Sequence, residues 1–326
     1  MRRAFLIFTI LVIALLIVLL GAMLFGGEKL PFFETIKAFG GIGGLNEQQQ
    51  RILWEIRVPR VLLGASVGAA LAMAGASYQA ILRNPLAEPY LLGVSNGAAL
   101  GTMFALVFFG NLALMRPLLA FVGAGVSTAA VYTLARDRAG MSAERLILSG
   151  VIVTTFLSSA IVLITSLLDA TRLRSFTFWL LGDLTSAGKE SFYIAFGAVM
   201  IGLLILTWTA RSLNLLMLGE RDAFDFGVEV GRVRLIVFTT ASALVGASVA
   251  ASGSVGYVGL VVPHWIRLAV GSDNRIVLPA SAIVGAIFVV VADTVARTII
   301  APRELPVGAV TALIGAPLFV YLLRKS

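Results

Sequence analysis

The stretch from Gly75 to Gly97 reads G-A-S-Y-Q-A-I-L-R-N-P-L-A-E-P-Y-L-L-G-V-S-N-G and joins two strongly apolar segments. Its centre is polar and contains two prolines, Pro85 and Pro89. Each proline disfavours helix at the residue before it, so Asn84 and Glu88 are expected in extended or turn conformations. Asn-Pro is also a favoured start for a turn. The pattern predicts a chain that leaves a membrane, turns tightly and enters it again.

The composition is that of an integral membrane protein. Of the 326 residues, 59% are hydrophobic and 13% are charged, whereas soluble domains carry about a quarter charged residues. The uncharged runs are longer than barrel strands and do not alternate in polarity, so they predict helices. These runs are Ala4–Gly27, Val61–Leu82, Pro89–Met115, Pro117–Ala135, Leu146–Leu168, Ser191–Ala210, Leu235–Ile266, Ile276–Ala292 and Leu305–Leu323.

The run Leu235–Ile266 is too long for one helix and is interrupted by Ser252–Gly256 and by Pro263. Basic residues at both ends of the chain, Arg2-Arg3 and Arg324-Lys325, predict that both termini are cytoplasmic. This orientation needs an even number of crossings, and splitting the long run gives ten. The predicted fold is therefore an all-α integral membrane protein of about ten transmembrane helices.

The chain is expected to form a single transmembrane domain over residues 1–326, with its largest cytoplasmic loop at residues 211–234. The glycine-rich segment Gly93–Gly101 is unfavourable for the start of a helix, so broken backbone is expected there. Small residues on one face of Val61–Leu82, among them Gly68 and Gly75, predict close contact between helices.

Several classes of function are excluded or disfavoured by residues that the chain lacks. It has no cysteine, a single histidine and no G-x-x-x-x-G-K-[ST] phosphate-binding loop. Thiolate metal sites, cysteine nucleophiles and nucleotide hydrolysis by this chain are therefore not expected. The net charge of +8 is explained by the positive-inside rule for membrane proteins rather than by binding to nucleic acid.

The string Q-x-x-x-x-N-P-L-A-E-P-x-x-L-G-V-S-N-G-A at residues 79–98 resembles the signature of the FecCD-type permeases. These are the membrane subunits of ATP-driven, binding-protein-dependent (ABC) importers of ferric siderophores, haem and cobalamin. Four further stretches resemble the same family, at residues 213–220, 253–267, 292–297 and 304–319. The family-like positions within residues 79–98 and 253–267 include Asn84, Pro85, Glu88, Pro89, Pro263 and His264.

The resemblance implies a site of contact with an ATPase in the cytoplasmic loop 211–234. The matching segment, Leu218–Gly227, is a short charged helix-like stretch bracketed by glycines. The positions that match the family's ATPase-coupling segment are Leu218, Gly219, Glu220, Ala223, Phe224 and Gly227.

The resemblance also implies a docking site on the outer face. It matches Arg57, Arg60 and Arg297 to arginines that pair with glutamates on an extracytoplasmic substrate-binding protein. The predicted topology places all three at the outer ends of spans, against the usual charge bias. We expect exposed pairs that steer docking more than they add affinity; the alternative is snorkelling of the side chains at the membrane surface.

The transport path is expected between two copies of the chain, since family members resemble homodimers around a central channel. Span five and the hinge Gly253–Gly259, in particular Gly253 and Gly256, are candidates for its lining. The cytoplasmic gate is expected at Met141, Ser142 and Ala143. The resemblance implies two ATP-binding subunits, which carry ATP and Mg²⁺, and an extracytoplasmic binding protein as partners. It places the chain among the lipids of the inner (cytoplasmic) membrane. The chain itself is expected to bind no metal or cofactor and to catalyse no covalent chemistry.

Two alternatives depend on particular residues. A secondary transporter driven by an ion gradient would use Asp293, the one acid inside a predicted span, although an ion pair with Arg297 one turn away is the simpler interpretation. An intramembrane protease would need a Ser–His pair or an H-E-x-x-H motif, and His264 is expected only to make a turn or helix-end contact. The residues do not decide between a ferric siderophore, cobalamin and haem as cargo.

Overall fold

The computed structural model describes residues 2–323 apart from 27, 29, 110, 111, 113, 138, 139, 186 and 187. The helices and short helical turns are α1 (Arg2–Leu24), α2 (Phe32–Phe39), α3 (Glu47–Arg51), η1 (Ile52–Arg57), α4 (Val58–Ile81), η2 (Pro89–Leu92), α5 (Val94–Phe108), α6 (Met115–Ala135), α7 (Ala143–Thr165), α8 (Ala170–Leu180), α9 (Lys189–Leu218), α10 (Glu220–Asp225), α11 (Val230–Ser252), α12 (Val258–Val270), α13 (Asn274–Thr298) and α14 (Val307–Leu323). One antiparallel ribbon precedes α7 and consists of β1 (Arg136–Asp137) and β2 (Gly140–Met141), with Arg136 opposite Met141.

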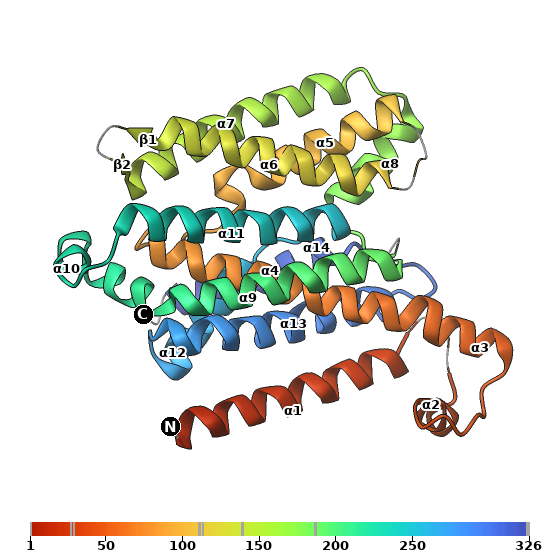
Figure 1. Ribbon diagram of the computed structural model, residues 1–326. Helices are drawn as coiled ribbons and strands as arrows, with labels where there is room; N and C mark the ends of the chain where they lie inside the picture. The colour runs from red at the N-terminus through yellow and green to blue at the C-terminus, as the bar shows by residue number, and fades with distance from the viewer. Residues whose placement is uncertain are drawn as a thin grey trace.

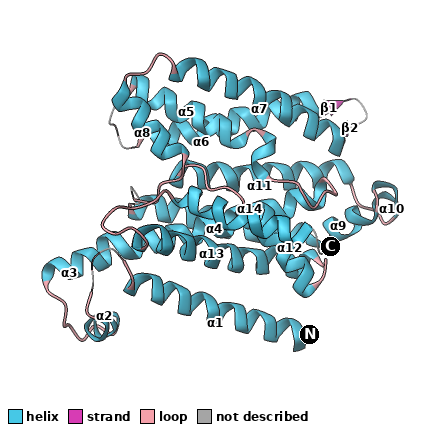
Figure 2. Cartoon of the chain, turned by 180° about the vertical axis from the view of Figure 1, so that it is seen from behind, coloured by secondary structure: helices cyan, strands magenta, loops and turns pink. Residues whose placement is uncertain are grey.

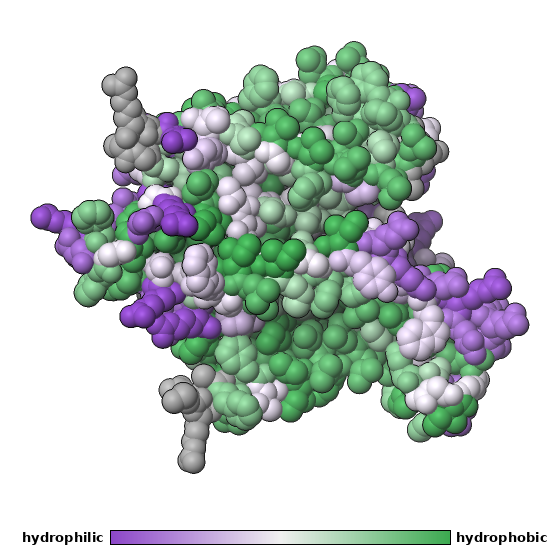
Figure 3. All heavy atoms as spheres, viewed as in Figure 1, coloured by the Kyte–Doolittle hydropathy of each residue, from purple (hydrophilic) through white to green (hydrophobic). Residues whose placement is uncertain are grey.

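The helical architecture and the number of spans agree with the prediction from sequence. Within the described ranges, seven helices are long and apolar enough to cross a membrane, and three shorter apolar helices, α5, α12 and α14, bring the total to ten. Figure 3 shows a broad hydrophobic band between two hydrophilic ends of the molecule. Arg324 and Lys325, on which the predicted orientation partly depends, lie outside the described residues.

The bundle is layered (Figure 1). Helices α5, α6 and α7 lie together on one side, and α11, α4, α9 and α13 form the middle (Figure 2). Helix α1 lies along the opposite edge, where it packs against α13. Both chain ends lie at the same end of the bundle as α10, as an even number of crossings requires.

Helix α4 is central because its small residues allow other backbones to approach. A Cβ atom on Gly68 would lie 2.1 Å from the carbonyl oxygen of Gly285 in α13. One on Gly75 would lie 1.8 Å from the carbonyl oxygen of Gly259 in α12. The predicted helix–helix contact along this face is confirmed, and these two positions admit only glycine without a shift of the backbone.

The boundaries of three elements differ from the prediction. The helix that contains α4 begins far upstream, at Glu47, and includes the π-helical turn η1. This wide turn lies directly before Pro59, which cannot donate an intrahelical hydrogen bond, and accommodates the proline without ending the helix. Helix α9 continues to Leu218, so the polar loop that was expected at residues 211–234 is confined to residues 219–229.

The third difference concerns Gly93–Gly101. Only Gly93, with φ of 77°, breaks the backbone, and α5 is regular from Val94 onward. Gly97 and Gly101 lie inside the helix, where their missing side chains admit the backbone of α6 at Gly123 and Leu119. Close helix packing, rather than a break in the helix, accounts for these two glycines.

Candidate functional site

The signature loop follows the end of α4. Arg83 has φ of 50°, a left-handed conformation that ends the helix. The Oδ1 atom of Asn84 accepts a hydrogen bond from the backbone N–H of Leu86 at 2.9 Å, which forms an Asx turn across Pro85. The turn η2 and Gly93 then lead into α5. The predicted turn is confirmed.

The signature loop is bonded to the segment that joins α11 to α12. The hydroxyl of Tyr90 donates to the carbonyl of Val255 and accepts from its N–H, each at 2.9 Å. The carboxylate of Glu88 accepts from the N–H of Tyr257 at 3.3 Å, at the N-terminus of α12, where a negative charge is favourable. The signature at residues 79–98 and the family-like stretch at 253–267, whose bonded residues are 165 and 169 positions apart, are therefore in direct contact.

The two hinge glycines have different surroundings. Gly253 has φ of 66°, and a Cβ atom there would lie 2.0 Å from the carbonyl oxygen of Trp179 in α8. Gly253 is buried, and it allows the backbone to pack closely against α8. Gly256 has open space where a side chain would lie. That these glycines line a transport path stays a prediction.

Pro263 and His264 lie inside α12, not at its end as predicted. The break in the long apolar run comes from Gly253–Tyr257 alone, because α12 continues through the proline to Val270. His264 packs edge-on against the ring of Phe319 in α14, with 6.3 Å between ring centroids. The expected helix-end contact of His264 is therefore replaced by packing between helices.

The proposed ATPase-contacting segment, Leu218–Gly227, contains α10, which projects at one end of the bundle (Figure 1). Gly219 and Gly227 bracket it with φ values of 157° and 79°. Ala223 is buried against the bundle, whereas Leu218, Phe224 and Phe226 are exposed. Three large apolar side chains at the surface of a polar end are typical of a contact with another protein.

Glu220 fixes this segment to the rest of the chain. Its Oε1 atom lies 2.6 Å from Nη2 of Arg234, on α11, and 3.8 Å from Nη2 of Arg83. Arg234 is almost completely buried, and its Nη1 donates to the carbonyl of Met141 in β2. A single arginine thus joins the coupling segment to the predicted gate.

The predicted gate residues form the entry to α7. Met141 ends the ribbon and is buried. The side chain of Ser142 is the N-cap of α7 and accepts from the N–H of Arg145 at 3.2 Å. Ala143 is the first residue of the helix. Their position fixes where α7 begins; their role as a gate stays a prediction.

The three outer arginines are buried, so the expectation of exposed charges is wrong. Arg57, Arg60 and Arg297 have 4%, 7% and 3% of their surface exposed. Arg57 donates to the carbonyls of Met23 and Leu24 at 3.0 and 2.9 Å. Arg297 donates to the carbonyl of Ala22 at 2.5 Å. These carbonyls end α1 and have no partner within the helix, so the arginines cap it.

Asp293 lies between two of these arginines. Its Oδ1 accepts from Nε and Nη2 of Arg60 at 3.0 and 2.8 Å, and its Oδ2 lies 3.4 Å from Nε of Arg297. Arg60 also donates to Glu304 at 2.7 Å. The predicted ion pair is confirmed, and this outer network, defined as Arg60, Asp293, Arg297 and Glu304, accounts for an acid within a span.

Helix α7, the predicted path-lining span, carries a row of hydroxyl groups on an exposed face. Thr154, Thr155, Ser158 and Ser159, with Val162, surround a shallow depression of about 450 Å³. Asn96 of α5 donates to Ser158 at 2.8 Å. Polar groups in a membrane span usually face another helix or water rather than lipid, so this face is suited to contact with another helix or with water.

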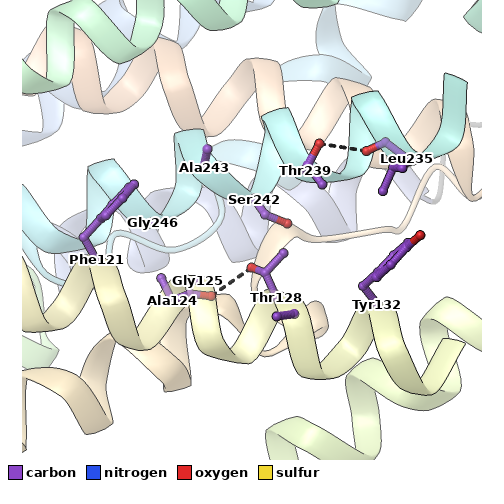
Figure 4. Close-up of a pocket in the computed structure, with 11 residues that line it drawn as sticks. Phe121, Ala124, Gly125, Thr128, Tyr132, Leu235, Thr239, Ser242, Ala243 and Gly246 are labelled. Carbon is purple, nitrogen blue, oxygen red and sulfur yellow. Dashed lines mark hydrogen bonds between the residues drawn. The ribbon is translucent and has the colours of Figure 1, made fainter. Parts of the chain in front are cut away.

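A second surface feature is an apolar groove between α6 and α11 (Figure 4). It has a volume of about 390 Å³ and is lined mainly by small and apolar residues. Its threonines, Thr128 and Thr239, donate to carbonyls of their own helices at Ala124 and Leu235, each at 2.8 Å. Hydroxyls on the α7 face, those of Thr155 and Ser159, likewise donate to carbonyls of their own helix.

Comparison with known proteins decides the family. The profile of the FecCD transport family matches residues 12–325. The chain belongs to this family. It is 42% identical over 284 residues to the cobalamin import system permease protein of Halobacterium salinarum, a match that covers 86% of this chain and 75% of the relative. It is 38% identical to the hemin transport system permease protein of Yersinia pestis, with 97% and 94% covered.

A solved structure of an ABC transporter has the same fold. It shows an inward-facing conformation of a metal-chelate type ABC transporter and superposes with a TM-score of 0.87. The two chains are 32% identical, and the comparison covers 98% of this chain and 99% of the other. The chain is thus a multi-pass membrane protein that belongs to a family of transport permeases.

Three features of this FecCD chain were missed from its sequence. Arg234 appears there only as one of several arginines in a polar loop, and its burial could not be anticipated. The hydroxyl row of α7 was present as T-T-x-x-S-S at residues 154–159, a signal less conspicuous than charged or aromatic residues. Glu304 lies in a matched stretch, but its pairing with Arg60 spans 244 positions.

Proposed function

We propose that this chain is the permease subunit of a binding-protein-dependent ABC importer in the cytoplasmic membrane. The observation that carries the proposal is the FecCD match over residues 12–325, joined to relatives named as permeases of import systems. Two copies would form the path, two ATP-binding subunits would supply ATP hydrolysis with Mg²⁺, and an external binding protein would deliver the cargo. The chain itself would hold no cofactor.

The cargo class we propose is a metal chelate, that is, a metal ion held by an organic ligand. The relatives are named for cobalamin and hemin, and the similar solved structure is described as of metal-chelate type. Ferric siderophores are chelates of the same kind. Selection among them would lie mainly on the binding protein, since a wide path makes few specific contacts.

We place the ATPase contact on α10 and its flanking residues. The exposed side chains of Leu218, Phe224 and Phe226 would enter a groove of the ATP-binding subunit, while Ala223 and Glu220 keep the segment attached to the bundle. The path would run along the hydroxyl row of α7, with Met141–Ala143 at its inner end.

We place the binding protein over the outer network. Arg60 is buried, but its partner Glu304 has 39% of its side chain exposed. An acidic side chain of the binding protein would reach Arg60 by displacing Glu304. Arg57 and Arg297 would then contribute by fixing the position of this end of the molecule, through the carbonyls of α1 that they cap.

The ion-driven alternative has no comparable support. Asp293 would have to exchange a proton or a cation, yet both of its oxygens lie against arginines. A transported cation would therefore have to displace an arginine to reach this carboxylate. The ion pairs of Asp293 with Arg60 and Arg297 account for an acid at this position.

Assembly provides the direct test of this proposal. The chain is co-expressed with its cognate ATP-binding subunit and the purified complex is weighed by native mass spectrometry. Two copies of each subunit are expected, and Phe224→Asp, which places a charge on the exposed apolar surface of α10, should reduce the recovered complex. A permease that never retains the ATP-binding subunit, with or without the substitution, would contradict the proposal.

A further inference from the structure

Arg234 makes two hydrogen bonds from a buried position, each to a different element of the chain. Only 2% of the residue is exposed. Its Nη1 donates to the carbonyl of Met141, and its Nη2 donates to Glu220 at 2.6 Å. A guanidinium group presents several N–H donors in one rigid plane, so one side chain can hold two partners in a fixed relation.

The two partners belong to elements that lie far apart in the sequence. Glu220 lies in the first turn of α10, the segment proposed to contact the ATPase. Met141 ends the ribbon that leads into α7, and Ser142 next to it caps that helix. Glu220 also lies 3.8 Å from Arg83, where α4 ends and the signature loop begins.

We propose that Arg234 is a positioning residue that transmits a displacement of α10 to the inner end of α7. This inference rests on the proposed function, because it assumes that an ATPase moves α10. A buried charge that loses one partner is strongly unfavourable, so α10 and the Met141 strand keep their relation to Arg234 and move together. The left-handed or extended glycines on either side, Gly219 and Gly227, allow α10 to change its direction.

A purely structural role for Arg234 is the rival explanation. Both explanations predict that its removal destabilises the protein. Only the relay predicts uncoupling, in which the complex hydrolyses ATP but moves less cargo for each ATP. The amount of cargo imported per ATP hydrolysed, measured per assembled transporter, therefore separates the two.

The test uses the whole transporter, with its ATP-binding subunits and binding protein, in proteoliposomes supplied with labelled cobalamin, hemin or a ferric siderophore. Glu220→Gln removes the charge that Arg234 meets, and Arg234→Gln removes the guanidinium. Both should lower the import-to-hydrolysis ratio several-fold while hydrolysis persists. Arg234→Lys keeps the charge but offers one nitrogen in place of two, so its ratio should fall between Arg234→Gln and the unmodified protein.

Glu229→Gln is the matched control. It makes the same change of charge outside Leu218–Gly227, where Glu229 forms an exposed ion pair with Arg232 at 3.7 Å, and its ratio should equal that of the unmodified protein. Unchanged ratios in both Gln variants at Glu220 and Arg234 overturn the relay. If the Arg234 variants do not assemble, Glu220→Gln decides alone, since Glu220 is only half-buried. Absence of ATP-dependent import by the unmodified protein would instead contradict the proposed function, and the relay with it.

Discussion

At the outer end of this protein, individual charged side chains are buried among the helices, where a charge is energetically costly. Asp293 has 2% of its side chain exposed, and Arg60 and Arg297 have 8% and 4%. Such groups persist because each meets an opposite charge and further hydrogen bonds, and breaking the set leaves an uncompensated charge behind. Arg297 and the neighbouring Arg57 also satisfy the last carbonyls of α1, so with the outer network they hold three helices, α1, α4 and α13, together.

Asp293→Asn tests this network at nearly constant side-chain size. It removes the negative charge that both arginines share, so the free energy of unfolding should fall by about 3–5 kcal/mol. The exposed pair of Glu34 and Lys37, 3.1 Å apart, supplies the control, because Glu34→Gln should change stability by less than about 1 kcal/mol. Denaturant unfolding in detergent measures both, and equal effects would contradict a special role for Asp293.

The surroundings of individual side chains were the feature that the sequence predicted least well. The arginines at positions 57, 60 and 297 were correctly singled out as unusual, because they oppose the positive-inside bias, but their burial was not foreseen. Burial depends on the end of α1 lying beside α4 and α13, a tertiary arrangement with no local signal. Arg234 was missed for the same reason.

Among the helices, close approach is set by glycine. Gly75→Ala would place a methyl group 1.8 Å from the carbonyl oxygen of Gly259, so α4 and α12 would have to separate. We expect a loss of about 1–3 kcal/mol in the free energy of unfolding, measured by denaturant titration in detergent. Gly125→Ala on α6 is the control, because a Cβ atom added there would meet no other atom within 4 Å; alanine should leave stability unchanged or raise it by up to about 1 kcal/mol. A larger loss at Gly125 than at Gly75 would contradict this account of packing.

The exposed hydroxyl face of α7 leads to a prediction about water access. The chain contains no cysteine, so single cysteines can be introduced without background. Thr155 and Phe156 are both exposed, adjacent in sequence and about 100° apart around the helix. If the hydroxyl face lines the path, Thr155→Cys in the reconstituted transporter should react faster with a charged, membrane-impermeant thiol reagent than Phe156→Cys. Equal rates, or a faster reaction at position 156, would remove α7 from the lining.

The sequence predicted the presence of the helices better than the residues at which they begin and end. Hydrophobic length alone located the spans, and the prolines at positions 85 and 89 located the signature turn. The errors occurred where tertiary structure overrode a residue's usual conformational preference. Pro263 did not end α12, and the π-helical turn before Pro59 let the helix that contains α4 begin at Glu47. Gly97 and Gly101 allow close helix packing instead of breaking α5. In each case the deciding contact or backbone adjustment came from tertiary structure.

On the scale of the whole molecule, the proposed docking would make the outer network and the binding protein compete for Arg60. Glu304 is the exposed member of that network and pairs with Arg60 at 2.7 Å. If an acidic side chain of the binding protein takes its place, Glu304→Gln should tighten binding of the binding protein several-fold, because the internal competitor loses its charge. Surface plasmon resonance on permease in nanodiscs measures the dissociation constant; weaker binding would show that Glu304 itself is a docking residue.

The central claim is that this FecCD permease moves a metal chelate when ATP is hydrolysed on a partner chain. The most direct test is uptake into proteoliposomes that contain the permease and its ATP-binding subunits, with the binding protein outside. Labelled cobalamin, hemin and ferric siderophores are supplied in parallel, with ATP or with an imposed ion gradient. We predict uptake of one chelate that requires both ATP and the binding protein. Uptake that ignores ATP and follows the ion gradient would contradict the account.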